Sequence, residues 1–265
     1  MDATASGAAT ASSDTMIRLE GVEKRYGKFQ ALEKLDLHVE AGEVFGFLGP
    51  NGAGKTTTIR MLSGVLQPSA GRILIDGLDL STHALEARRR VGYIPDRPYL
   101  YEKLTAREFL DFIGNIYGMS QDAIDQRAPE LLAEHDLTHR ADELIEAWSH
   151  GMKQRLVLSA ALLHDPRLLV VDEPMVGLDP HGARRIKDRF LEVARSGRTV
   201  FLSTHSLDVA QEVCDRVGIL YRGRLVALGT VDDLLTQHGT DLEEIFLKIT
   251  EEEHDARRDA PVAGA

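Results

Sequence analysis

A glycine-rich loop between an apolar segment and a helix-forming segment constrains this chain more than any other feature. Residues 49–57 fit the spacing G-x-x-x-x-G-K-[ST] at every position, with apolar residues 44–48 before them and residues 58–62 after them. Glycine lets the backbone turn tightly, so that its N–H groups converge on phosphate oxygens at the N-terminus of the next helix. A chance glycine-rich turn would not need these flanks. The pattern therefore predicts a strand, a phosphate-binding loop and a helix, the nucleotide-binding unit of an α/β fold with a parallel sheet.

The loop and the start of its helix supply most of the predicted nucleotide ligands. We expect the Lys55 ammonium to reach the β- and γ-phosphates and the Thr56 hydroxyl to ligate Mg²⁺. The predicted contacts are Gly49, Pro50, Asn51, Gly52, Ala53, Gly54, Lys55, Thr56 and Thr57. The ligands implied by this motif are therefore a nucleoside triphosphate and Mg²⁺.

A second apolar segment ends in two acidic residues. Residues 168–171 read Leu-Leu-Val-Val, and Asp172 and Glu173 follow them. A buried parallel strand delivers its last residues to the sheet edge where the phosphate loop also lies. We therefore expect Asp172 to hold Mg²⁺ opposite Thr56, and Glu173 to orient or deprotonate the attacking water. A strand that ends at a helix-capping aspartate is the alternative, and it is weaker beside a complete phosphate loop.

Composition narrows the class of protein. The chain has 265 residues, enough for one large domain or two small ones. Its formal net charge of -11 disfavours nonspecific binding to nucleic acid, so we expect no nucleic acid partner. The single cysteine, Cys214, permits no internal disulfide. No apolar stretch is long enough to span a bilayer, and residues 1–15 have neither the basic start nor the apolar core of a signal peptide.

The order of patterns predicts one domain over residues 16–248, with disordered tails at 1–15 and 249–265. Two alternating apolar segments at the start predict an antiparallel β subdomain, and helical periodicity between about 100 and 148 predicts an all-helical insert. Strands are expected near 17–22, 31–39, 72–80, 91–95, 168–171, 199–202 and 217–220, and helices at 128–134, 141–147, 183–195, 208–213 and 231–247. In the insert, one apolar helical face is expected from Phe109, Leu110, Ile113, Ile116 and Tyr117.

Further motifs follow the loop in a fixed order. Residues 148–155 read Trp-Ser-His-Gly-Met-Lys-Gln-Arg, which alone indicates a serine-capped amphipathic helix. The two acids at 172–173 come next, then Gly-Leu-Asp at 177–179 and Ser-Thr-His at 203–205. Taken with the phosphate loop, the series resembles the ATP-binding cassette (ABC) family over roughly residues 17–247. The combination is far more specific than the loop alone, which many unrelated nucleoside triphosphatases share.

The resemblance implies a role for each residue that matches a family motif. Tyr26 corresponds to the aromatic residue that stacks on the adenine ring. Ser149, His150, Gly151 and Met152 correspond to the signature motif, which contacts the ATP bound to the partner subunit. Its serine hydroxyl and the helix N-terminus behind it would meet the γ-phosphate, and a helix N-terminus favours an anion.

Two more residues complete the implied ATP site. Asp179 corresponds to the loop that crosses the dimer interface, and His205 corresponds to the switch histidine that bonds the γ-phosphate. With Glu173 and His205 as catalytic residues, the resemblance implies a homodimeric, Mg²⁺-dependent ATPase that sandwiches each ATP between two subunits. It also implies a separately encoded integral membrane permease as partner, which would hold the chain at the cytoplasmic face of the cell membrane.

The chain departs from the commonest family pattern in two places. The signature usually reads Leu-Ser-Gly-Gly-Gln; here Ser149 and Gly151 remain and the other three differ. Asp96 stands where the family has a glutamine that touches the Mg²⁺ shell, and an aspartate is shorter but a better ligand for a hard cation. The text around Asp96 is similar to cassettes of multidrug, antibiotic or polysaccharide export systems, which implies export. The predicted metal ligands are Thr56, Asp96 and Asp172.

Other functions stay open on the sequence alone. One is a soluble regulatory or DNA-maintenance ATPase that uses the same dimer clamp without a permease; such relatives usually join two cassettes or insert a long coiled coil, and this chain has neither. A phosphate-loop kinase would not explain the signature together with Asp179 and His205. His135 and His139 have the spacing of a helical zinc pair, but they lack the adjacent glutamate and a third ligand, so we expect an exposed helical segment there.

Overall fold

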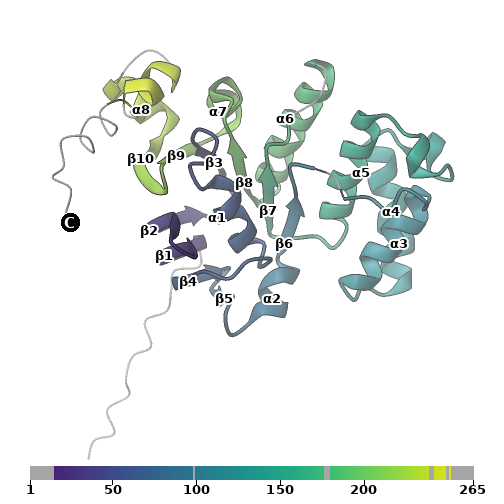
Figure 1. Ribbon diagram of the computed structural model, residues 1–265. Helices are drawn as coiled ribbons and strands as arrows, with labels where there is room; N and C mark the ends of the chain where they lie inside the picture. The colour runs from purple at the N-terminus through teal and green to yellow at the C-terminus, as the bar shows by residue number, and fades with distance from the viewer. Residues whose placement is uncertain (1–14, 98, 176–179, 239–241, 249–250, 252–265) are drawn as a thin grey trace, which may run out of the picture.

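The computed structural model describes residues 15–97, 99–175, 180–238, 242–248 and 251. A six-stranded sheet in the order β10-β9-β3-β8-β7-β6 runs through the middle of the molecule (Figure 1). Neighbours from β9 to β6 are parallel, and β10 pairs with β9 in the antiparallel sense. Its strands are β3 (Val44–Leu48), β6 (Val91–Ile94), β7 (Leu168–Asp172), β8 (Thr199–Thr204), β9 (Arg216–Tyr221) and β10 (Arg224–Thr230). The three central strands, β3, β8 and β7, are buried along their whole length, as their apolar sequences require.

A second, antiparallel sheet forms the N-terminal part of the fold. Its order is β2-β1-β4-β5, with β1 at Thr15–Tyr26, β2 at Phe29–Glu40, β4 at Ala70–Ile75 and β5 at Leu78–Asp79. The hairpin between β1 and β2 turns at Gly27, where φ is +58°, and Tyr26 pairs with Phe29 across it. The predicted antiparallel β subdomain is therefore confirmed.

Helix α1 (Lys55–Leu62) lies between the two sheets and shares one apolar core with them (Figure 1). Phe45 of β3 stacks on Phe201 of β8 at a centroid distance of 5.5 Å, and Ile59 of α1 belongs to the same cluster. This packing fixes the start of α1 at the carboxyl ends of the central strands. The remaining core helices are α2 (Ala84–Arg89), α6 (Pro180–Arg195), α7 (Leu207–Val213) and α8 (Val231–His238), and residues 242–248 are also helical.

The helical insert forms a separate group beside the central sheet (Figure 1). It contains α3 (Ala106–Ile116), α4 (Gln121–Glu134), the short 3₁₀ turns η1 (Thr138–Arg140) and η2 (Ile145–Ala147), and it packs on α5 (His150–Leu162). Serine or threonine begins each of its α-helices, since Thr105 forms a capping box with Glu108 and Ser120 accepts a hydrogen bond from the Ala123 N–H. The predicted all-helical insert is therefore present, and no helix in the described ranges has the length and apolar character needed to cross a bilayer.

The structure corrects the details of this insert. The helix expected at 141–147 is wrong: the N–H groups of Ile145 and Glu146 donate to the carbonyls of Leu104 and Glu102, so the segment pairs with the chain before α3. The helix expected at 128–134 is longer, because it begins after the cap at Ser120 and runs through the proline at 129.

The predicted apolar face of α3 is also only partly right. Ile116 is 62% exposed, whereas the glycine at 114 is buried. A Cβ at Gly114 would lie 2.6 Å from the Ile124 side chain of α4, so this glycine allows the two helices to approach. The buried face of α3 therefore contains Gly114, where α4 approaches closely, and not Ile116 as the periodicity had predicted. The sequence analysis also missed α2, which has six residues, and β10, an edge strand without a buried residue.

Candidate functional site

The phosphate-binding loop turns tightly against β2 and β9 and leads into α1. Gly52 and Gly54 have positive φ values of +80° and +114°. A Cβ at Gly54 would lie 2.9 Å from the carbonyl oxygen of Ala31, so only glycine fits this approach. No side chain caps α1 at Gly54, which leaves the first N–H groups of the helix to the loop and its ligand. This is the geometry of an anion-binding helix N-terminus.

Lys55 and His205 converge on the carboxylate of Glu173. Lys55 is only 6% exposed, and its Nζ donates to the Gly49 carbonyl at 2.7 Å and lies 3.5 Å from Glu173 Oε1. The other carboxylate oxygen, Oε2, lies 2.9 Å from Nδ1 of His205. Glu173 has φ +49°, a left-handed conformation just after the end of β7, where the chain turns away from the sheet. The carboxylate thus stands between the phosphate-loop lysine and the end of β8.

Asp172 is fully buried at the end of β7. Its Oδ1 accepts a 2.5 Å hydrogen bond from Ser203 Oγ, and burial raises the pKa of this carboxyl, with hydrogen bonding from Ser203 opposing the shift. Oδ2 is buried and has no hydrogen-bond partner among the residues that the structure describes. The Thr56 hydroxyl is close enough to lower this pKa, but it does not close a hydrogen bond of ordinary geometry. A buried carboxylate oxygen without a partner suits a hard divalent cation, so the residues fit Mg²⁺.

A pocket of about 350 Å³ opens beside the phosphate loop. It is lined by Tyr26, Phe29, Ala31, Pro50, Asn51, Gly52, Gly54, Lys55, Thr56, Thr57, Asp96 and Glu173. Tyr26 is 47% exposed at the rim of the pocket, where a flat ring system can reach it. Asp96 lines the same pocket and follows β6, the last strand of the six-stranded sheet. The pocket thus gathers the predicted aromatic residue and most of the predicted loop with two of the predicted acids, Asp96 and Glu173. Asp172 and His205 do not line it.

Two pocket residues were not predicted from the sequence. Phe29 and Ala31 line the pocket from the start of β2, and Phe29 is 64% exposed. An exposed phenylalanine opposite Tyr26 in a two-residue hairpin is the signal that was available, because paired residues in a hairpin lie on the same side of the sheet. Phe29 therefore offers a second aromatic surface at the rim.

The signature residues lie elsewhere. Ser149 caps α5, with its hydroxyl accepting a 3.4 Å hydrogen bond from the Met152 N–H. Ser149 and His150 are exposed, but the Met152 side chain is 8% exposed and belongs to the core. Met152 can therefore offer a ligand only its backbone. None of these residues lines the phosphate-loop pocket, and α5 stands apart from α1 on the far side of β6 and β7 (Figure 1). Asp179 lies outside the described residues.

The structure overturns one expectation about the paired histidines. His135 is not exposed: it is 8% exposed at the end of α4, and its Nδ1 lies 2.9 Å from the Leu131 carbonyl. Burial, with the nearby charge of Arg189, lowers its pKa to about 4. His139 lies in the separate turn η1. Helix α4 ends at Glu134, before both histidines, so the i, i+4 geometry of a zinc pair does not form.

Comparison with known proteins identifies the family. The family model described as ABC transporter matches residues 32–176. This chain belongs to the ABC transporter ATP-binding family. The linearmycin resistance ATP-binding protein LnrL of Bacillus subtilis (strain 168) is 39% identical over 226 residues, 85% of this chain and 73% of that protein. The daunorubicin resistance ATP-binding protein DrrA3 of Streptomyces coeruleorubidus is 40% identical over 236 residues, 89% of this chain and 75% of that protein.

Solved structures agree with this assignment. An ATP-binding subunit of an ABC transporter superposes with a TM-score of 0.82 at 36% identity, covering 89% of this chain and all of that one. A dimeric cassette in a post-hydrolysis state, bound to ADP and phosphate, superposes with a TM-score of 0.74 at 25% identity over 81% of this chain and 98% of that chain. The chain is therefore the ATP-binding subunit of an ABC transporter, an ATPase that uses ATP with Mg²⁺.

Proposed function

We propose that Glu173 is the catalytic base of this ATPase and that His205 and Lys55 act with it at the γ-phosphate. The observation that carries the proposal is the convergence of Lys55 Nζ at 3.5 Å and His205 Nδ1 at 2.9 Å on the two oxygens of Glu173. Both partners are groups that bind phosphate oxygens, so the γ-phosphate can take them from Glu173 and leave its carboxylate beside the attacking water.

The nucleotide is held by groups of different kinds. The loop N–H groups and Lys55 bind the phosphates, and Tyr26 and Phe29 offer aromatic faces to the base. Thr56, Asp172 and Asp96 would hold Mg²⁺, which when bound neutralises charge on the phosphate oxygens. Asp96 adds a carboxylate at a place where the family has a neutral glutamine, and its presence in the pocket lining supports this role.

The second half of each ATP site comes from another copy of the chain. Ser149 and His150 at the start of α5 are exposed and separate from the phosphate loop of their own chain, which supports contact in trans. Asp179 is assigned to the same dimer interface on the family pattern. In this scheme ATP brings two copies together head to tail, and hydrolysis lets them separate.

The subunit would act at the cytoplasmic face of the membrane, where the permease selects the cargo and receives the motion of the ATPase dimer. The relatives named for linearmycin resistance, daunorubicin resistance and Nod factor export support export as the direction of transport. We propose the domain boundaries 16–248, with the helical insert at about 100–148, as the unit that performs this work.

The test is the variant Glu173→Gln, which keeps the size of the side chain and removes its basicity. We expect it to bind ATP, to form a stable ATP-dependent dimer, and to lose hydrolysis by about 10² to 10⁴-fold, the usual contribution of a general base. Steady-state ATPase assays and sedimentation velocity measure the two effects. Glu86→Gln, on the exposed face of α2, is the control. A Glu173→Gln protein that hydrolyses ATP at the normal rate would remove Glu173 from the catalytic role.

A further inference from the structure

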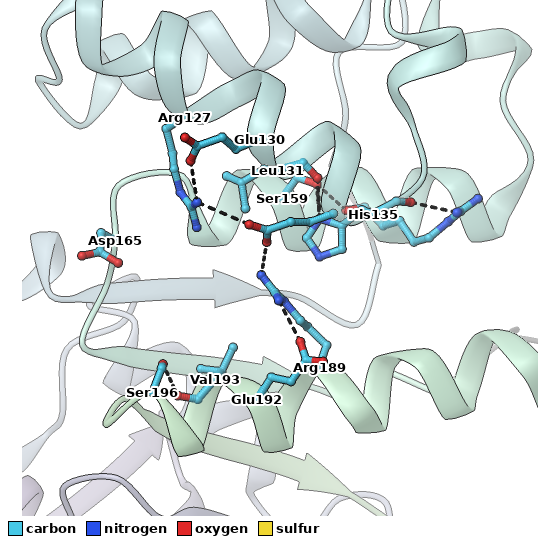
Figure 2. A network of polar contacts seen from close by, with 12 residues as sticks. Arg127, Glu130, Leu131, His135, Ser159, Asp165, Arg189, Glu192, Val193 and Ser196 are labelled. Atoms are coloured by element: carbon cyan, nitrogen blue, oxygen red, sulfur yellow. Dashed lines mark hydrogen bonds and ion pairs between the residues drawn. The ribbon is translucent and has the colours of Figure 1, made fainter.

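The helical insert meets the core helix α6 across a polar pocket. The pocket has a volume of about 270 Å³ and is lined by the end of α4, by α5 and by one face of α6. Figure 2 shows Arg127 and Glu130 on the insert side, Arg189 and Glu192 on the α6 side, and His135 between them. Charged side chains therefore line part of the boundary between the insert and α6. Leu158 of α5 also lines the pocket and belongs to the apolar core.

One ion pair crosses the boundary. Glu134, the last residue of α4, bonds the Arg189 guanidinium of α6 through Nη2, and it also lies 3.5 Å from Arg127. Arg189 uses its other terminal nitrogen for Glu192, one turn further along α6. The Arg189 and Glu134 side chains are 23% and 35% exposed, so water screens this pair only in part. A partly shielded pair between two elements can affect their relative placement.

The neighbouring histidine ties the same end of α4 to α5. Nδ1 of His135 lies 2.9 Å from the Leu131 carbonyl, which can only accept, so this nitrogen carries the proton. The Ser159 hydroxyl of α5 lies 2.8 Å from the same Nδ1, and Arg155 of α5 donates to the His135 carbonyl at 2.8 Å. The end of α4 that carries Glu134 is therefore hydrogen-bonded to α5, whose N-terminal cap is Ser149.

The pocket at this boundary also has buried polar atoms in its lining residues. His135 Nε2 is a buried acceptor and Arg189 Nε is a buried donor, and neither has a partner within the described part of the chain. Both residues line the pocket, which is large enough for water to bridge such a pair. Close apolar packing would fix the angle between the insert and α6, but a cavity lined by polar groups fixes it less firmly. The ion pair therefore contributes more to that angle here than it would over a packed surface.

We propose that Glu134 and Arg189 are positioning residues that set the angle between the helical insert and the core. Through this pair, α6 holds α5 at the orientation in which Ser149 of one subunit can meet the nucleotide on the phosphate loop of the other. The proposal rests on the proposed function for its second part, because the angle matters only if two copies close on ATP head to tail.

The test uses Glu173→Gln as the parent, so that ATP-dependent dimers accumulate. Into it we place Glu134→Gln, Arg189→Gln, and both together. Each single change is expected to weaken the ATP-dependent dimer by about three- to five-fold in its dissociation constant, the upper range for a partly exposed ion pair. The double variant is expected to be no weaker than the worse single one, because both changes remove one contact. Raising the salt concentration should shrink all three differences.

The matched control is Glu130→Gln. Glu130 lies one turn before Glu134 on α4 and pairs with the same Arg127 at 2.9 Å, but no ion pair or hydrogen bond joins it to α6 among the described residues. We expect its dimer constant to equal that of the parent. Binding of a fluorescent ATP analogue to the dilute monomer is expected to be unchanged in every variant, because the phosphate-loop pocket contains none of these residues. A loss that appears already at this step would contradict the proposal.

Hydrogen exchange on the monomer tests the pair without relying on dimerisation. Glu134→Gln and Arg189→Gln should speed exchange of the amides at the end of α4 and in the middle of α6, and Glu130→Gln should not. If the parent forms no ATP-dependent dimer, the proposed function fails, but hydrogen exchange on the monomer still tests whether the Glu134–Arg189 pair holds α4 against α6. Unchanged exchange in both elements, additive effects in the double variant, or an equal effect of Glu130→Gln would each overturn the proposal.

Discussion

The two regions of this molecule that we propose to contact nucleotide are built in opposite ways. At the phosphate loop, Lys55 is 6% exposed and Asp172 is fully buried. Tyr26 of β1 and Lys55 of α1 line one pocket, and Asp172 of β7 is hydrogen-bonded to Ser203 of β8. At the start of α5, Ser149 and His150 are exposed, and the serine hydroxyl serves its own helix as a cap. The difference teaches that the first site can bind ATP within one chain. The second does not line that pocket, which is why we propose that it contacts the nucleotide of another chain.

The largest effect expected from this comparison is at Lys55. Lys55→Ala removes the buried ammonium that we propose to face the phosphates, so ATP affinity should fall by about a hundredfold or more. Isothermal titration calorimetry on the monomer measures it. Lys34→Ala, on the exposed face of β2, should change nothing. An unaltered affinity in Lys55→Ala would show that the loop is not the phosphate site.

The buried His135 of the insert should make the free energy of unfolding depend on pH. His135 has a folded pKa of about 4 against an ordinary value of 6.5, so the unfolded chain binds more protons between these values and the folded protein loses stability as pH falls from 6.5 to 4. The loss is roughly 2 to 3 kcal/mol. In urea unfolding from pH 7 to 4, His135→Asn should flatten this part of the profile, whereas His139→Asn should not. Parallel profiles for the two variants would contradict the burial of His135.

Two substitutions at Ser149 distinguish its role as the cap of α5 from its proposed role at the partner's nucleotide. Ser149→Ala loses the cap of α5 and should cost about 1 kcal/mol of stability, as Ser120→Ala should at α4. Ser149→Asp keeps a capping group, but it sets a negative charge against the partner's triphosphate. We expect Ser149→Asp to weaken the ATP-dependent dimer of the Glu173→Gln protein by about tenfold while monomeric ATP binding stays normal. Ser120→Ala should leave the dimer intact, and a dimer that tolerates Ser149→Asp would argue against contact in trans.

The smallest expected effect is at the aromatic rim. Tyr26 is 47% exposed, so stacking of a base on its ring contributes little beyond surface burial. Tyr26→Ala should raise the dissociation constant for ATP by about three- to tenfold, since stacking on an aromatic residue is worth about 1 kcal/mol. Tyr26→Phe should bind ATP as the native protein does. Fluorescence titration distinguishes them, and a loss in Tyr26→Phe equal to that in Tyr26→Ala would assign the effect to the hydroxyl.

The sequence was sufficient wherever the pattern itself dictates the geometry. The run at 49–57 implied a strand, a loop and a helix, and the apolar residues 168–171 implied a buried strand ending in acids; β3, α1 and β7 form there. Both patterns are local, because glycine spacing and continuous apolar sequence restrict the backbone directly.

Features that depend on distant contacts were not predictable in the same way. Residues 141–147 have helix-forming composition, but hydrogen bonds to Leu104 and Glu102 hold them otherwise. The burial of His135 follows from its contact with Ser159, which lies 24 residues further along the chain. Phe29 was missed because its place at the rim depends on the hairpin that sets it beside Tyr26. The roles of the site residues remain predictions, which the experiments above address.

The most direct test of the account is complementation between two impaired proteins, Lys55→Ala and Ser149→Asp. Lys55→Ala keeps its signature and Ser149→Asp keeps its phosphate loop, so a head-to-tail mixed dimer contains one site in which both halves are native. We predict that the mixture hydrolyses ATP faster than the sum of the two proteins measured apart. A mixture no faster than that sum, under conditions where crosslinking detects the mixed dimer, would contradict the claim that each ATP is bound between two copies of this chain.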